Sequence, residues 1–291
     1  MIADYHMHLE RGGLDAAYLR RFVETAAARG VDEICITEHA YHFPAAAALL
    51  DKPDYVAARS RGYPLDAYVN LVLSARAQGL PVRLGIEMDY IPGSEEDIAR
   101  FLEGHPWDLV IGAVHWIGDW GFDLDPGSWA GRDVTEAYRS YFALAEQAVR
   151  SGLFDVFAHP DVIKVFGARP DPGFGEELLG WYDRLVAAAR QAGVCLELSS
   201  AGLRKPVGEI YPDRRLLERA HRAGVPITLA SDAHEPQHVG WAFDRLVSAA
   251  RDAGYRTVTT FSRRRPRQAA LAGVSSSAAD PGRRAGRRRP G

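Results

Sequence analysis

Residues 2–39, IADYHMHLERGGLDAAYLRRFVETAAARGVDEICITEH, contain one complete strand–helix–strand unit. Apolar residues within 15–30 recur with helical spacing, and Gly30 ends the predicted helix. An apolar run typical of a buried strand precedes this helix, and a second one, VDEICIT, follows it. Because a helix joins the two strands, we expect them to pair in parallel through a right-handed crossover.

The same unit recurs along the chain. Further helices are predicted up to Gly79 and near 95–104, 133–151, 175–193, 213–223 and 240–253, each followed by an apolar strand. Seven or eight such units that close on themselves form a barrel of the TIM type, and an open doubly wound sheet is the alternative. Candidate chemical groups follow nearly every strand, whereas an open sheet usually binds at one switch point, so the closed barrel is favoured.

The composition is that of an ordinary soluble protein. Of the 291 residues, 47% are apolar and 25% are charged. No apolar run is long enough to span a bilayer and no export leader is recognisable, so we expect a cytoplasmic protein without a membrane partner. Cys35 and Cys195 each lie in an apolar strand, which favours buried, unpaired thiols.

A single domain is expected over residues 1–261, followed by a basic tail over 262–291. The tail lacks apolar periodicity and is rich in Arg, Pro, Gly and Ser, so we expect it to be disordered. It holds nine arginines and one aspartate, which leaves a net charge of −11 on the rest of the chain. An acidic body disfavours nucleic acid as a partner, and nothing in the sequence indicates an oligomeric state.

Histidines and carboxylates follow the predicted strands, at His6, His8, Glu38, His39, Glu87, His115, His159, Asp232 and His234. In a parallel barrel these strand ends lie on one rim. A single histidine there is usually structural, but residues i and i+2 of a strand point to the same side, so each close pair can reach one ion. Imidazole and carboxylate together suit Zn, Mn or Fe(II), and so many ligands indicate two or three metal ions.

Six segments, DYHMH, ITEHA, GIEMD, GAVHWIG, FAHPDVIK and ASDAH, occur in this order between about residues 4 and 240. As a set they make the chain resemble the PHP (polymerase and histidinol phosphatase) family of metallo-phosphoesterases. LSSAGLRKPVGEIYP and TTFSRR resemble segments of its standalone histidinol-phosphatase branch. The resemblance implies an α/β fold, a distorted TIM-like (β/α)7 barrel, with three divalent metal ions.

The resemblance also implies the ligands of each ion. The first would be bound by His6, His8, Glu87 and Asp232, the second by Glu87, His115 and His159, and the third by His39, His234 and one further residue. Many family members place that residue six to eight positions after the HxH pair, where this chain has Asp15. Glu10 instead continues the alternation of His6 and His8 and is favoured, while Asp15 is suited to cap the first helix.

The function implied by the resemblance is metal-dependent hydrolysis of a small phosphate monoester. The closest resemblance points to L-histidinol phosphate, which would give L-histidinol and phosphate in histidine biosynthesis. Glu87, Asp161 and His234 are the candidate catalytic residues, with Asp161 either orienting a ligand or acting as general acid.

Three cations are candidates to bind the phosphate. Arg204 ranks first, because a guanidinium matches the geometry of phosphate, and Lys164 and Lys205 follow. His42, in the long loop at 40–63, is a candidate to contact the substrate.

Two other functions stay open. Phosphatase or nuclease action on nucleotides or single strands occurs among PHP proteins, but it would favour an open basic groove on a chain whose body is acidic. A hydrolase of the amidohydrolase type also uses histidines and aspartates at strand ends, typically with a bridging lysine. No lysine follows a predicted strand here.

Overall fold

The strands of the central sheet follow one another in chain order around a barrel. The computed structural model describes residues 1–273. Every neighbouring pair in this sheet is parallel. The strands are β1 (Ala3–Asp4), β2 (Glu33–Ile36), β3 (Val82–Asp89), β4 (Leu109–Ala113), β7 (Val156–Phe157), β8 (Cys195–Ser199) and β9 (Ile227–Ala230).

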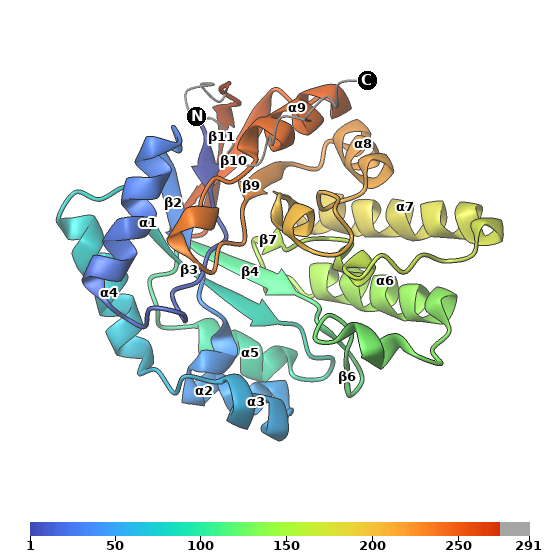
Figure 1. Cartoon of the computed structure of the whole chain (residues 1–291), viewed down its shortest axis with the longest axis horizontal. Helices are drawn as coiled ribbons and strands as arrows, with labels where there is room; N and C mark the ends of the chain where they lie inside the picture. The colour runs from blue at the N-terminus through green and yellow to red at the C-terminus, as the bar shows by residue number, and fades with distance from the viewer. Residues whose placement is uncertain (274–291) are drawn as a thin grey trace, which may run out of the picture.

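Helices surround these strands on the outside (Figure 1). They are α1 (Ala16–Ala28), α4 (Leu65–Ala77), α5 (Glu95–Leu102), α6 (Val134–Arg150), α7 (Gly175–Ala192), α8 (Arg214–Ala223) and α9 (Phe243–Ala253). The first of them shows how the sequence forms such a helix. The Asp15 carboxylate accepts a hydrogen bond from Tyr18 N at 2.7 Å and caps α1, while Leu19, Phe22 and Ala26 turn one buried face to the core.

The barrel closes where β9 meets β1. Tyr5 N donates to Leu229 O at 3.1 Å, Ala233 N to His6 O at 3.2 Å, and His8 N to Ala233 O at 2.8 Å. Three backbone hydrogen bonds therefore join the first strand to the last, and the predicted distorted (β/α)7 barrel is confirmed.

The long loop predicted at 40–63 contains local structure. It includes α2 (Pro44–Ala47) and α3 (Pro53–Arg59), with short 3-10 turns before and between them. The Tyr55 ring of α3 packs edge-on against Trp116 of a small hairpin, β5 (Trp116–Ile117) and β6 (Trp120–Gly121), with ring centroids 5.1 Å apart. The loop and the hairpin thus meet beyond the end of β4.

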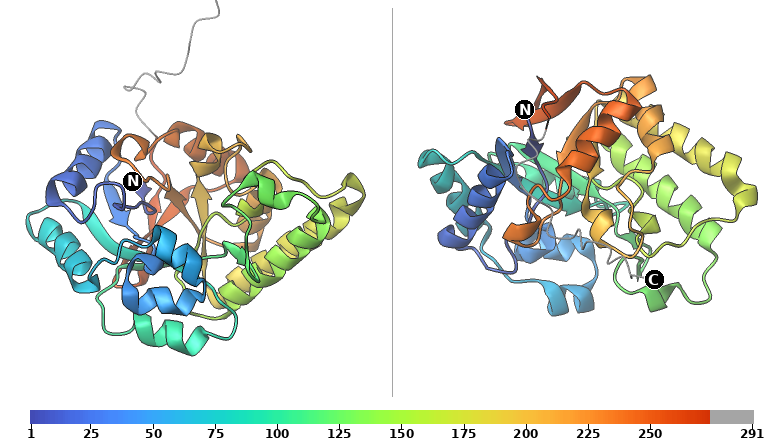
Figure 2. Two further views of the ribbon diagram at one scale, coloured as in Figure 1. Left: turned by 60° about the horizontal axis from the view of Figure 1, so that its bottom comes forward. Right: turned by 45° about the horizontal axis from the view of Figure 1, so that its top comes forward.

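The folded part does not end at residue 261, where the sequence analysis placed the boundary. β10 (Thr257–Ser262) pairs antiparallel with β11 (Arg265–Ala270), outside the barrel, and the Met1 amino group donates to Ala270 O at 2.7 Å. Two views in Figure 2 show the N-terminus beside this hairpin. Arg264, which the sequence analysis assigned to the tail, donates from Nε to Asp155 Oδ2 at 2.9 Å. This partner is distant in the sequence. Residues 274–291, on which the expected disorder also falls, lie outside the described residues.

Cys35 and Cys195 are buried free thiols, as predicted. Among the described residues, no helix is both long and apolar enough to cross a membrane.

Candidate metal centre

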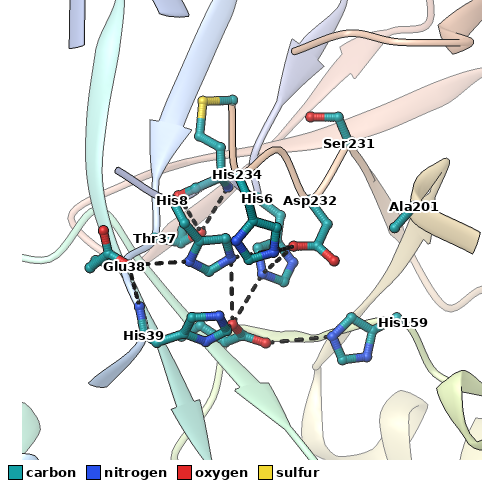
Figure 3. Close-up of polar contacts among 12 residues, drawn as sticks. His6, His8, Thr37, Glu38, His39, His159, Ala201, Ser231, Asp232 and His234 are labelled. Carbon is teal, nitrogen blue, oxygen red and sulfur yellow. Dashed lines mark hydrogen bonds and ion pairs between the residues drawn. The ribbon is translucent and has the colours of Figure 1, made fainter. Parts of the chain in front are cut away.

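The carboxyl ends of the barrel strands bring nine ligand-type side chains into one cluster, here called the ligand cluster. Its members are His6, His8, Glu10, His39, Glu87, His115, His159, Asp232 and His234. Figure 3 shows the rings of His6, His8, His39 and His234 gathered beside Asp232, with His159 on the far side. The ring of His8 is nearly parallel to those of His39 and His234, at centroid distances of 4.0 and 4.5 Å, and these two rings are themselves 5.8 Å apart.

Glu87, from the end of β3, occupies the centre of the ligand cluster. Its carboxylate oxygens lie between 2.6 and 3.7 Å from ring nitrogens of five histidines, namely His39, His6, His159, His8 and His115. The side chain is buried. A single carboxylate thus contacts histidines from four different strand ends, since His6 and His8 both follow β1.

Asp232 is the second shared carboxylate. Its Oδ1 lies 3.2 Å from His234 Nε2, 3.3 Å from His8 Nε2 and 3.9 Å from His6 Nε2. The backbone at Asp232 has φ = 50° and that at His159 has φ = 26°, a region that residues other than glycine rarely adopt. Such strain persists only where the surroundings enforce it, and it is common at functional sites.

The donors of the ligand cluster fit divalent metal ions. Both Glu87 oxygens, both ring nitrogens of His8, His6 Nε2 and Glu10 Oε2 are buried without a hydrogen-bond partner. Groups of three donor atoms lie within 4.8 Å of one another, among them His6, His8 and Asp232; His6, Glu87 and His159; and His8, His39 and His234. Buried polar atoms without partners are rare in proteins, and this set of imidazoles and carboxylates suits Zn, Mn or Fe(II).

Ionisation within the cluster supports the same conclusion. Burial by itself would raise the pKa of Glu87 and of Asp232, but neighbouring histidines outweigh it and hold each pKa well below its ordinary value. Burial likewise opposes the charging of His8, yet the nearby carboxylates of Asp232 and Glu38 raise its pKa to about 10. The carboxylates stay ionised and hold protons on nearby imidazoles, and a bound metal ion would displace those protons.

Further carboxylates orient the ligand histidines, and the sequence analysis missed this role. Glu197, on β8, accepts a hydrogen bond from His159 N at 3.2 Å, and its other oxygen lies 2.7 Å from His6 Nδ1. Asp89 Oδ1 lies 2.8 Å from His115 Nδ1. A partner of this kind fixes the ring and raises its basicity as a ligand. Two features of the sequence could have indicated this role. Glu197 is an acid inside an apolar strand, and Asp89 is two residues after Glu87 and so points to the same side of its strand.

Glu38 and His42 form a third support. Glu38 is fully buried, accepts a hydrogen bond from Leu9 N at 2.8 Å, and lies 3.6 Å from His8 Nδ1. His42 Nε2 is 3.7 Å from Glu38, and its Nδ1 accepts a hydrogen bond from Arg61 N at 3.2 Å. Burial lowers the pKa of His42 to about 4, so the ring is neutral.

The two candidates for the last ligand lie in different places. Glu10 Oε1 is 2.7 Å from His234 Nδ1, inside the ligand cluster. Burial opposes ionisation of Glu10, but His234 and other histidines lower its pKa to about 2. Asp15 is exposed and caps α1. The structure therefore brings Glu10 to the cluster and leaves Asp15 outside it.

Arg204, the first-ranked phosphate candidate, does not line the cavity above the ligand cluster. Its Nη2 donates to Ser231 O at 2.7 Å and to Asp232 O at 3.0 Å, and its guanidinium lies over the Trp241 ring at 5.5 Å. In this position it holds the backbone of the strained Asp232.

Lys164 and Asp161 form a buried ion pair outside the cavity. Lys164 Nζ lies 2.8 Å from Asp161 Oδ2 and donates to Ile210 O at 2.9 Å, and both side chains are almost fully buried. Asp161 Oδ2 also accepts from Asp213 N at 2.7 Å. Neither residue lines the cavity, whereas the exposed Lys205 does.

The ligand cluster forms the base of a cavity of about 350 Å³. His42, the candidate for substrate contact, also lines it. The rest of the wall includes aromatic residues from the 40–63 loop and the β5–β6 hairpin, four cations, and two carboxylates outside the ligand cluster. These are Tyr41, Tyr55 and Trp116; Arg11, Arg59, Arg61 and Lys205; and Asp89 and Asp123.

The model of the PHP domain family matches residues 4–201. A probable histidinol-phosphatase of Deinococcus radiodurans is 37% identical over 266 residues, which cover 89% of this chain and 96% of that protein. A histidinol-phosphatase of Lactococcus lactis is 26% identical over 89% of this chain and 94% of its own length.

A solved structure supports the fold. The crystal structure of histidinol phosphate phosphatase from Lactococcus lactis, complexed with Zn, L-histidinol and phosphate, superposes with a TM-score of 0.74 at 24% identity. It covers 91% of this chain and 98% of that one. Asp232 and His234 lie beyond the residues matched by the family model, yet they complete the ligand cluster.

Proposed function

The chain belongs to the PHP domain family, and from this premise we propose that it hydrolyses L-histidinol phosphate to L-histidinol and phosphate. The observation that carries the proposal is the complete ligand cluster at the base of a substrate-sized cavity. Relatives named histidinol-phosphatase, which this chain matches over nearly their whole length, support the choice of substrate. Family membership also decides against the amidohydrolase alternative.

We further propose that three divalent ions, Zn, Mn or Fe(II), bind in the ligand cluster. The first would be held by His6, His8, Glu87 and Asp232, the second by Glu87, His115 and His159, and the third by His39, His234 and Glu10. Ions bound there supply Lewis acidity, which offsets phosphate charge and lowers the pKa of water.

The chain's own residues would bind and orient the ester. Arg59, Arg61 and Lys205 line the cavity, and within the described residues no carboxylate lies within ion-pair distance of any of them. Their charges are therefore available to the phosphate group, and arginine offers it a bidentate fork. Glu197 and Asp89 would keep the ligand histidines in place while the ester reacts.

The free thiols agree with a location of the protein in the cytoplasm. Cys35 and Cys195 are unpaired, as is usual in a reducing compartment.

The choice between Glu10 and Asp15 can be tested by counting metal ions. Glu10→Gln is expected to lower the metal content by about one ion per chain, because Gln replaces an anionic ligand with a neutral one. The matched variant Asp15→Asn is expected to keep the full content and to lose only part of its helix cap. Elemental analysis of both purified proteins is the measurement. If Glu10→Gln kept its full metal content and Asp15→Asn lost an ion, Asp15 and not Glu10 would be the ligand of the third ion.

The substrate can be tested by measuring phosphate release from metal-replete protein. The panel comprises L-histidinol phosphate, nucleoside monophosphates and bisphosphates, and a short oligonucleotide. We expect kcat/KM for L-histidinol phosphate to exceed that for any nucleotide at least about tenfold, a difference of about 1.4 kcal/mol in transition-state binding. A nucleotide turned over tenfold better would favour the nucleotide alternative instead, by about the same free energy.

A further inference from the structure

A carboxylate in the cavity wall is not used by the metal centre. Asp123 follows the β5–β6 hairpin and lines the cavity, and its Oδ1 is buried without a hydrogen-bond partner in the described part of the chain. No lysine or arginine of residues 1–273 lies within ion-pair distance of it. A buried carboxylate oxygen without a partner is costly, so the position suits a cation that is supplied from outside the chain.

Asp123 does not belong to the ligand cluster. It occurs in none of the groups of donor atoms close enough to share an ion. Asp89, which also lines the cavity, is engaged by His115 at 2.8 Å. Asp123 is therefore the carboxylate of this wall, among the described residues, that has neither a histidine nor a cation beside it.

The segment that carries Asp123 is held in place by its neighbours. Phe122 N donates to His115 O at 3.3 Å, and Trp129 Nε1 donates to Phe122 O at 2.8 Å. The Phe122 ring is fully buried and packs edge-on against Tyr141, with centroids 5.5 Å apart. The position of Asp123 relative to the ligand His115 is therefore fixed before any substrate arrives.

An aromatic surface lines the same cavity. Tyr55 contacts Trp116 at 5.1 Å and Tyr41 at 5.2 Å between ring centroids, and all three residues line the cavity. Arg59 lies over the Tyr55 ring at 6.0 Å without reaching Asp123. A carboxylate together with aromatic faces is a combination that binds organic ammonium groups.

We propose that Asp123 binds the ammonium group of the substrate and thereby selects phosphate esters of amino alcohols over nucleotides. The inference rests on the proposed function, since L-histidinol phosphate carries an ammonium group on the carbon next to the ester carbon and a nucleoside monophosphate has none. The metal centre and the wall cations hold the phosphate end, and Asp123 holds the other end. A site built for a polar group rejects analogues that lack it, because its own buried partner is then left unpaired.

The test compares Asp123→Asn with the wild type on two esters. On L-histidinol phosphate the variant is expected to show a KM raised roughly 10- to 100-fold, since a hydrogen bond to a charged group is worth about 1.5–3 kcal/mol. On 3-(imidazol-4-yl)propyl phosphate, which differs from L-histidinol phosphate only in lacking the amino group, the two proteins should agree within about twofold. In the wild type, KM for L-histidinol phosphate should be lower than KM for the ester without the amino group. The ratio of these two values should match the increase in KM that Asp123→Asn shows on L-histidinol phosphate.

Asp119→Asn is the matched control. Asp119 lies on the same hairpin with its side chain almost fully exposed, pairs with Lys52 at 3.0 Å, and does not line the cavity. The Asp119→Asn variant loses the same charge on the same hairpin, but away from the cavity. Both KM values should therefore equal those of the wild type. Metal content and Tm of both variants show whether the centre and the fold are intact.

The outcomes separate the inference from the function on which it rests. Equal losses on both esters in Asp123→Asn, or no loss on either, would overturn the role of Asp123 while wild-type turnover of L-histidinol phosphate still supports the function. Wild-type protein that hydrolyses the control ester but not L-histidinol phosphate would overturn the function itself.

Discussion

Glu87→Gln is expected to lower kcat by roughly 1000-fold, because a metal ion contributes several kcal/mol to the transition state and about 1.4 kcal/mol is a tenfold change in rate. The carboxylate contacts five histidines and is the ligand proposed to be shared by two ions. Glutamine keeps the shape but not the charge, so metal content should fall together with activity. Phosphate release and elemental analysis on one preparation measure both effects.

Glu96→Gln is the matched control for this variant. Glu96 is exposed on α5, the helix that follows β3, and its replacement changes the net charge equally. It should keep wild-type kinetics and loading. If Glu87→Gln retained its metal ions and a kcat close to that of the wild type, the central role of Glu87 would be wrong.

Lys164→Met is expected to destabilise the fold by about 3–5 kcal/mol, because removing one partner of a buried ion pair leaves the other charge uncompensated. Asp161 would lose its partner at 2.8 Å, and Ile210 O would lose its donor. For a protein of this size the loss corresponds to a fall in Tm of roughly 10 °C. Calorimetry with matched metal loading is the measurement.

Lys205→Met makes the same chemical change at the cavity. Since Lys205 is exposed and without an ion-pair partner in the described residues, its Tm should not change. Its KM for L-histidinol phosphate should rise roughly tenfold, about the worth of a hydrogen bond to a charged group. If Lys164→Met were instead as stable as the wild type and raised KM, the two lysines would have exchanged roles.

The sequence was informative where chemistry and periodicity coincide. His6 and His8 are two residues apart on a strand and must point to one side, and the same spacing relates Asp232 and His234. Once strand and helix alternate, a parallel barrel places these ends on one rim. The fold and the gathering of the ligand cluster therefore followed from local patterns.

The sequence was less informative where a side chain's partner is distant. Nothing local distinguishes Lys164, which is buried against Asp161, from Lys205, which is free at the cavity. Arg204 was ranked by its suitability for phosphate, but its guanidinium binds the carbonyls of a loop nearly thirty residues away. β11 was assigned to a tail because its arginines look solvated, although the neighbouring Arg264 pairs with Asp155.

The closure of the barrel between β1 and β9 has a consequence during synthesis on the ribosome. Glu10 and His234, whose side chains meet at 2.7 Å, are separated by 224 residues of chain. The ligands His6, His8 and Glu10 are synthesised first, and the site stays incomplete until Asp232 and His234 have been added. A prematurely terminated product that stops before Asp232 would carry most of the barrel and still be inert, so turnover begins only once translation has nearly finished.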